Sequence, residues 1–153
     1  MKKMLLLLAN IWLFSFFACA TPTGTALQAT AVQQSACLPN SEIQEPAKTD
    51  GKEALTVSAS GDQVEISFKN APFRCEQKVT WEASLDGQIL TAVVRPQEMN
   101  PTTVPRCGCR YDLGVKIGPL NKGKYTVKIQ QKSDNYGSPS TTKDVHSSEV
   151  TIP

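Results

Sequence analysis

Residues 110–117 read Arg-Tyr-Asp-Leu-Gly-Val-Lys-Ile, and an apolar residue occupies every second position of this octapeptide. Successive side chains of a β-strand point to opposite faces of its sheet, so a period of two separates an apolar face from a polar one. The apolar face consists of Tyr111, Leu113, Val115 and Ile117. The opposite face receives only charged residues and a glycine. This pattern predicts a β-strand with one buried side and one solvent-facing side.

The same period of two recurs on both sides of this octapeptide. It is present in residues 54–59, 64–69, 79–85, 88–95, 125–130 and 145–152. Ser60-Gly61 marks one turn between these segments, and Asp86-Gly87 marks a two-residue hairpin turn, in which both positions need positive φ. The segments show no convincing amphipathic helical pattern. They therefore predict an all-β fold, a single seven-stranded antiparallel sandwich over residues 54–153.

One corner and two aromatic residues give the predicted sandwich a resemblance to a known family. Residues 117–127 read Ile-Gly-Pro-Leu-Asn-Lys-Gly-Lys-Tyr-Thr-Val and resemble the E–F corner of fibronectin type III and other immunoglobulin-like domains. The resemblance, which covers about residues 54–152, implies that Tyr125 hydrogen-bonds back to the corner and that Trp81 is the buried tryptophan of the third strand. It implies an architecture and no activity, because one fold carries many functions.

The first 20 residues are predicted to be a signal peptide. A positively charged start precedes an apolar run over residues 4–18, which is shorter than the ~20 residues that span a membrane. Cleavage is expected either after Ala20, at an A-x-A match, or before Cys19. Residues 16–19 resemble a bacterial lipobox, and cleavage there would leave Cys19 lipidated and the chain anchored to a membrane surface. Cleavage after Ala20 would instead discard Cys19 with the leader.

Residues 21–53 are expected to form a flexible linker. They are rich in Ala, Thr, Gln, Ser and Pro and show no sustained apolar period, although a short helix over residues 26–36 is an alternative. The leader holds Lys2 and Lys3 and no acidic residue, so its removal lowers the 16 basic residues to 14, which equals the 14 acidic residues. A mature chain with a net charge near zero and no basic stripe is not expected to bind nucleic acid.

The direction of the strands predicts which end of the sandwich acts. Connections between antiparallel strands alternate between the two ends, so the tight turns collect at one end. The long connections 70–77, 96–106 and 132–144 collect at the other. Long loops on a rigid scaffold commonly carry binding residues. The candidate binding residues of this end are Arg95, Arg106, Asn135 and Tyr136.

Four cysteines are also expected at the end with the long connections. Cys75 pairs with either Cys107 or Cys109, and Cys37 reaches the remaining one through the linker. A direct bond between Cys107 and Cys109 is unfavourable, because an extended strand holds their Cα atoms near the upper limit for a disulfide. Export to an oxidising compartment favours these two disulfides. The alternative is a thiolate metal site that includes His146, which is expected to begin the last strand at the same end, although paired C-x₂₋₄-C spacing is absent.

The sequence contains no motif of a catalytic site. G-x-S-x-G, H-E-x-x-H and a phosphate-binding glycine loop are all absent, so no catalytic residue, no cofactor and no metal is predicted. The leading hypothesis is a non-catalytic, extracytoplasmic binding or interaction module of the bacterial envelope, in the periplasm, anchored at a membrane or released outside. It would contact a protein or glycan partner, and a membrane only through a lipid. The alternatives are a protease inhibitor or accessory protein that uses residues 96–106, and a metal-binding or redox protein that uses the cysteines.

Overall fold

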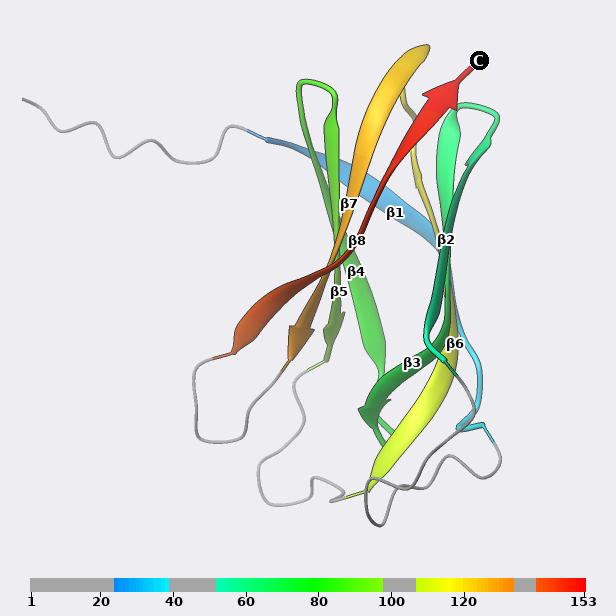
Figure 1. The fold of residues 1–153 in the computed structure, drawn as a ribbon, viewed down its shortest axis with the longest axis vertical. Coiled ribbons are helices and arrows are strands. Elements are labelled where there is room, and N and C mark those ends of the chain that lie inside the picture. The colour runs from blue at the N-terminus through cyan, green and yellow to red at the C-terminus, as the bar shows by residue number, and fades with distance from the viewer. Residues whose placement is uncertain (1–23, 39–51, 98–106, 134–139) are drawn as a thin grey trace, which may run out of the picture.

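The computed structural model describes residues 24–38, 52–97, 107–133 and 140–153. All regular elements of these residues are strands, as the sequence predicted, and the described part of the chain contains no helix (Figure 1). The strands are β1 (Thr25–Gln34), β2 (Ala54–Ser60), β3 (Gln63–Arg74), β4 (Val79–Asp86), β5 (Ile89–Pro96), β6 (Gly108–Gly118), β7 (Gly123–Ser133) and β8 (Thr141–Ile152). The predicted signal peptide, including Cys19, lies outside the described residues.

The eight strands form one hydrogen-bonded series in the order β2-β3-β6-β1-β4-β5-β7-β8. The series folds back on itself, so that β2, β3 and β6 stand on one side and β4, β5, β7 and β8 on the other (Figure 1). β1 joins the two halves. Its residues 25–27 pair with β4, and from Gln28 to Gln34 it pairs with β6.

The strand β1 corrects the prediction of seven strands, and for residues 25–34 it corrects the prediction of a linker over residues 21–53. None of its residues is buried, and most are exposed. Its place depends mainly on backbone pairing with strands on both sides, because only Leu27 and Ala29 of this strand pack, partly buried, against the core. Apolar periodicity in the sequence therefore could not predict this strand. The alternative prediction of a short helix over residues 26–36 is also wrong.

Successive strands along the chain run in opposite directions, as the sequence predicted. As a result, two strands that are not successive become parallel neighbours, which the sequence did not predict. β5 and β7 are parallel neighbours, with Ile89 opposite Thr126. They run the same way because β6, which lies between them in the chain, belongs to the other half of the series. The sheet is therefore not purely antiparallel.

The two short hairpin turns lie one residue later than predicted. Gly61 and Asp62 connect β2 to β3, and Gly87 and Gln88 connect β4 to β5. Only the glycine of each turn has a positive φ, 63° at Gly61 and 58° at Gly87. A positive φ at the first turn position alone is the pattern of a type II′ turn, which favours glycine there. The prediction that Asp86-Gly87 supplies two positive φ angles is therefore wrong.

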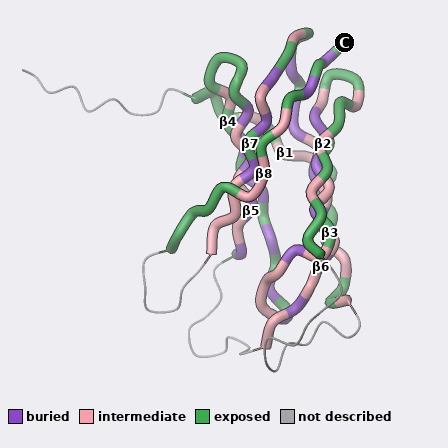
Figure 2. Tube along the Cα trace, viewed as in Figure 1, coloured by how far each residue is buried: buried purple, intermediate pink, exposed green. Residues whose placement is uncertain are grey.

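The hydrophobic core lies between the two halves of the series, and both halves contain buried segments (Figure 2). Each half contributes every second residue of its strands, because alternate side chains point to the same face. One half contributes Val64, Ile66, Phe68, Tyr111, Leu113, Val115 and Ile117. The other contributes Trp81, Leu90, Ala92, Val94, Tyr125, Val127, Ile129, Val150 and Ile152. The core therefore holds the two halves together and fixes the ends of their strands.

Candidate binding site

The structure contains two disulfides, Cys37–Cys109 and Cys75–Cys107, each with a Cα–Cα distance of 5.6 Å. This pairing is one of the two arrangements that the sequence left open. All four sulfurs lie at the end where β3 finishes and β6 begins. We call this end the cystine end and define it by these four cysteines.

The strand register explains why these partners meet. Arg74 pairs with Gly108 at the end of the β3–β6 ladder, so the next residue outward on each strand, Cys75 and Cys107, face each other. The N–H of Cys75 donates to the carbonyl of Cys107 at 3.2 Å. On the opposite edge of β6 the chain after β1 continues the pairing, because the N–H of Leu38 donates to the carbonyl of Arg110 at 3.0 Å. β6 is therefore flanked by one disulfide on each side.

A groove of ≈ 380 Å³ opens at the cystine end, between the ends of β3 and β6 on one side and of β5 and β7 on the other. Its described lining is Pro72, Phe73, Arg74, Gln77, Pro96, Cys107, Gly108, Cys109, Gln131, Lys132 and Ser133. These residues include two cations and no carboxylate. The amide of Gln131 donates to the carbonyl of Pro72 at 3.2 Å and links the two halves beside the groove.

Two glutamines shape the turn that borders this groove. Gln34, at the end of β1, donates to the carbonyl of Gln77 at 2.7 Å and accepts from the N–H of Val79 at 3.0 Å. The side chain of Gln77 is 5% exposed, and its oxygen accepts from the N–H of Arg74 at 3.2 Å. The long connection predicted over residues 70–77 is therefore wrong. β3 continues to Arg74, and only a tight, internally bonded turn separates it from β4.

A second pocket, of ≈ 320 Å³, lies on the other side of this turn. Its described lining is Gln34, Ser35, Ala36, Cys37, Glu76, Gln77, Lys78 and Tyr111. Gln77 lines both pockets. The hydroxyl of Tyr111 donates to the carbonyl of Arg74 at 3.1 Å, and burial raises the pKa of this phenol. The cystine end thus presents two adjoining concave surfaces held by partly buried hydrogen bonds.

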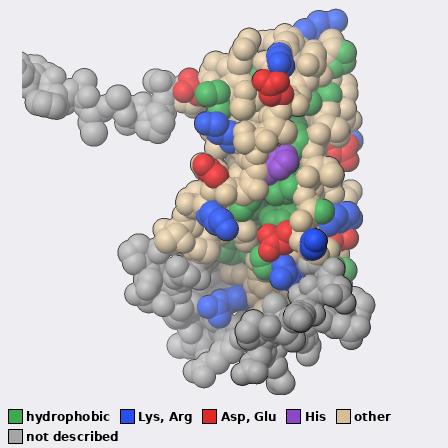
Figure 3. Space-filling model, viewed as in Figure 1, with side chains coloured by type: hydrophobic (Ala, Val, Ile, Leu, Met, Phe, Trp, Pro, Cys, Tyr) green, Lys and Arg blue, Asp and Glu red, His purple; other side chains and the backbone are tan. Residues whose placement is uncertain are grey.

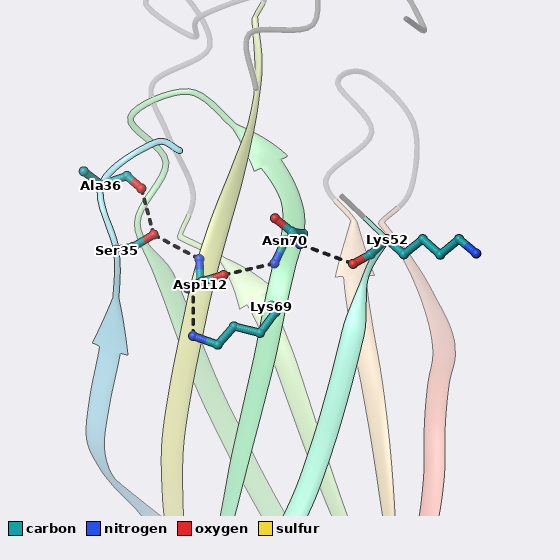
Figure 4. A network of polar contacts seen from close by, with 6 residues as sticks. All are labelled: Ser35, Ala36, Lys52, Lys69, Asn70 and Asp112. Carbon is teal, nitrogen blue, oxygen red and sulfur yellow. Dashed lines mark hydrogen bonds and ion pairs between the residues drawn. The ribbon is translucent and has the colours of Figure 1, made fainter. Parts of the chain in front are cut away.

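A network of polar contacts around Asp112 links the chain segments next to the cystine end (Figure 4). The carboxylate of Asp112 accepts from the ammonium of Lys69 at 2.9 Å and from the N–H of Asn70 at 3.2 Å. The hydrogen bond from Lys69 is the main reason why the pKa of Asp112 lies below its usual value. The N–H of Asp112 donates to the hydroxyl of Ser35 at 2.9 Å, and the amide of Asn70 donates to the carbonyl of Lys52 at 3.2 Å. The network therefore connects β3 and β6 with the chain after β1 and before β2.

This network was not predicted from the sequence. The asparagine at position 70, inside a strand pattern, is a signal that could have indicated the bulge on which the network depends. Asn70 has a φ of 56° and lies where the β3–β6 register shifts. Asparagine tolerates this left-handed region better than most residues, and such a residue inside a strand pattern is typical of a bulge. The bulge aims the N–H of Asn70 at Asp112.

The predicted binding residues are distributed differently from the expectation. Arg95 lies within β5 rather than in a loop, and its guanidinium forms an ion pair with Glu82 at 2.6 Å. Arg106, Asn135 and Tyr136 lie outside the described residues.

His146 also departs from the prediction. β8 begins at Thr141, so His146 lies within the strand, opposite Ile129, and does not begin it. His146 is half-buried and lies on the face of the sheet that also carries Ile129 and Val150. Among the described residues no group of three or more His, Cys, Asp and Glu side chains gathers as a metal site would require.

The two aromatic residues that carried the family resemblance both lie in the core. Trp81 is 7% exposed and pairs with Val94 across the β4–β5 hairpin. The hydroxyl of Tyr125 donates to the carbonyl of Asn121 at 2.9 Å, four residues upstream. This bond has the form that the resemblance implied for the corner before β7.

Comparisons of the chain with protein-family models, with curated proteins and with solved structures find no significant match. Within the described residues there is no helix of the length and apolarity that crossing a membrane would require. The geometry of the cystine end is therefore the basis for a functional proposal.

Proposed function

We propose that this chain is an exported, non-catalytic binding module that contacts a protein or glycan partner with its cystine end. The observation that carries the proposal is the gathering of both disulfides and both pockets at one end of the molecule. Disulfides persist in oxidising compartments, which fits an exported protein. A rigid rim around concave surfaces suits recognition, because a preorganised site loses little entropy on binding.

An immunoglobulin-like sandwich is the architecture that we propose for this module. Its support is the facing of two groups of strands across one core, together with the hydrogen bond of Tyr125. Two features depart from that family: β1 joins the two halves, and β5 lies between β4 and β7 as a parallel neighbour of β7.

We also propose that the leader directs the chain to a bacterial envelope and that Cys19 is the residue that lipid would modify. Intact-mass analysis of the exported protein tests this point. Cleavage before Cys19 with an added lipid supports an anchored form. A mass that corresponds to cleavage after Ala20 contradicts it and leaves a soluble exported form.

Neither alternative function gains support from a specific contact. Arg95, which an inhibitor loop would present, lies on a strand and is paired with Glu82. The four cysteines of the proposed metal or redox site are all in disulfides, and a disulfide sulfur is not a thiolate ligand.

Partner capture followed by variant binding tests the proposed function. The exported protein would be used to isolate partners from envelope extracts, and affinities would be measured for Phe73→Ala and Lys132→Glu, which change the groove. Lys122→Glu, in the turn at the opposite end, is the matched control. We expect the groove variants to weaken binding by about tenfold or more, as loss of an interface anchor typically does, and the control to leave it unchanged. Binding that is lost with Lys122→Glu and kept by the groove variants would contradict the proposal.

A further inference from the structure

β2 and β8 end the series of strands, so each has one side without a hydrogen-bonded neighbour. A free strand edge is a template for another strand, and proteins commonly protect such edges with charges or bulges. β8 carries Lys143, Asp144 and Glu149, and its register with β7 shifts between Ile129 and Gln130. β2 reads Ala-Leu-Thr-Val-Ser-Ala-Ser, has no charge and no proline, and pairs with β3 without a register shift. β2 is therefore the unprotected edge.

The hairpin geometry shows which backbone groups of β2 are free. Ser60 and Gln63 flank a two-residue turn and so form a hydrogen-bonded pair. Hydrogen-bonded pairs alternate along an antiparallel ladder, so Leu55, Val57 and Ala59 direct their N–H and C=O groups away from β3. Among the described residues no backbone partner faces these three.

The opposite half of the molecule forms no β-ladder with this edge. β8 comes close to both β2 and β3. Its residues Val150 and Ile152 are buried in the core. No backbone hydrogen bond joins β8 to β2 among the described residues, so the hydrogen-bonding groups of this edge remain unpaired.

We propose that two copies of this chain pair through β2, antiparallel, with Val57 of each copy on a twofold axis. In this register Val57 faces Val57 of the second copy, and Leu55 faces Ala59. These are the residues whose backbone groups are free, and each facing pair can exchange two N–H···O bonds. A shift by two residues in either direction would leave some of these groups unpaired. The register is thus fixed by the free edge itself.

Charge complementarity supports this partner and this register. Lys52 lies just before β2 and Asp62 in the turn just after it, each five positions from Val57, so this register brings each Lys52 to the same end of the interface as Asp62 of the second copy. Neither side chain takes part in an ion pair among the described residues. The facing residues between them, from 54 to 60, are all uncharged. No like charges meet, and opposite charges meet at both ends.

Sedimentation equilibrium of the exported protein and of charge variants tests this pairing. We expect a monomer–dimer equilibrium in the unmodified protein. Lys52→Glu and Asp62→Lys should each raise the dissociation constant by about tenfold, since each places two like-charge pairs at the interface. The double variant Lys52→Glu/Asp62→Lys restores opposite charges and should recover most of the affinity. The proposal would be overturned by a monomer at every concentration, or by a dimer whose dissociation constant is the same in these variants as in the unmodified protein.

Two substitutions at the twofold axis give an independent test. Val57→Pro removes an N–H that points away from β3, so the fold should survive, as circular dichroism can show, while the dimer is lost. Val57→Thr keeps the N–H and is the matched control, which should dimerise.

Disulfide trapping checks the register directly. Facing residues of a hydrogen-bonded pair have Cα atoms about 5.5 Å apart, which a disulfide can bridge. Val57→Cys should therefore form a covalent dimer under mild oxidation, whereas Ser58→Cys, which faces Thr56 of the second copy, should form much less. Equal trapping at both positions, or a dimer that survives Val57→Pro, would assign the interface elsewhere. The pairing does not depend on the proposed function, because the cystine end takes no part in it.

Discussion

Asp112 shows how one side chain can organise an end of this molecule. Its carboxylate and its N–H together contact Lys69, Asn70 and Ser35, which come from three separate segments of the chain. Charge-assisted hydrogen bonds of this kind are stronger than neutral ones, although partial exposure reduces their net value. The ionised form of Asp112 should therefore matter for stability.

Asp112→Asn is expected to lower the free energy of unfolding by about 1 kcal/mol at pH 7. The folded-state pKa of Asp112 is lowered, mainly by Lys69. The stabilisation is therefore fully present above the unfolded pKa near 3.9 and is lost as pH falls through the lowered folded value. Urea unfolding at pH 7 and at about pH 2 would measure the difference, which should vanish at the lower pH. Glu65→Gln changes a longer ion pair with Lys116, in which the carboxylate is more exposed than that of Asp112, and should have little effect at either pH.

Gly118, at the end of the molecule opposite the cystine end, packs too closely against neighbouring backbone atoms to carry a side chain. A Cβ at this position would lie 2.9 Å from the carbonyl oxygen of Asp62 and 3.2 Å from the Cα of Gln63, both backbone atoms. Gly118→Ala is therefore expected to destabilise the fold by about 1–3 kcal/mol, as overpacking does. Gly114→Ala is the control, because its nearest neighbours are side-chain atoms of Gln33, the closest at 3.5 Å. Equal melting temperatures for the two variants would contradict this account.

At the scale of elements, β1 is the strand whose place depends most on a covalent link. It buries no residue, and Cys37–Cys109 ties the chain just after it to β6. The other disulfide, Cys75–Cys107, ties β3 to β6, which already share a long ladder. The two bonds should therefore protect different parts of the fold.

Removal of either disulfide by a double Cys→Ser substitution is expected to cost about 3.5–4.5 kcal/mol in the chain-entropy account, with the larger value for Cys37–Cys109, because the sequence separations are 72 and 32 residues. Hydrogen exchange distinguishes the two variants. Loss of Cys37–Cys109 should raise amide exchange in β1 far more than in β3, whereas loss of Cys75–Cys107 should affect the ends of β3 and β6. Unchanged protection of β1 without its disulfide would show that backbone pairing alone holds this strand.

At the scale of the whole molecule, the face shown in Figure 3 carries no patch of a single charge. Basic and acidic side chains are interspersed on the face shown in Figure 3, in agreement with equal numbers of the two after loss of the predicted leader. Long-range steering of a charged partner is therefore weak. Recognition by this molecule should depend on local shape at the cystine end and on the free edge of β2.

The count of free thiols tests the covalent organisation of the molecule. In the denatured, unreduced protein, Cys37, Cys75, Cys107 and Cys109 should contribute no free thiol. Reaction with a thiol reagent before and after reduction would measure this, with four thiols expected to appear on reduction. Any thiol from these four before reduction would contradict the disulfide assignment.

The sequence by itself determined that the chain is all-β, that successive strands alternate in direction and that the four cysteines share one end. These properties follow from a period of two and from chain direction, both of which are local. Only the tertiary structure decided that β1 is a strand, that β5 and β7 are neighbours and that Gln34 and Asp112 organise the cystine end. The physical reason is that backbone pairing and hydrogen bonds between distant segments, such as Gln34 with Gln77 and Val79, leave no pattern of apolar residues along the chain.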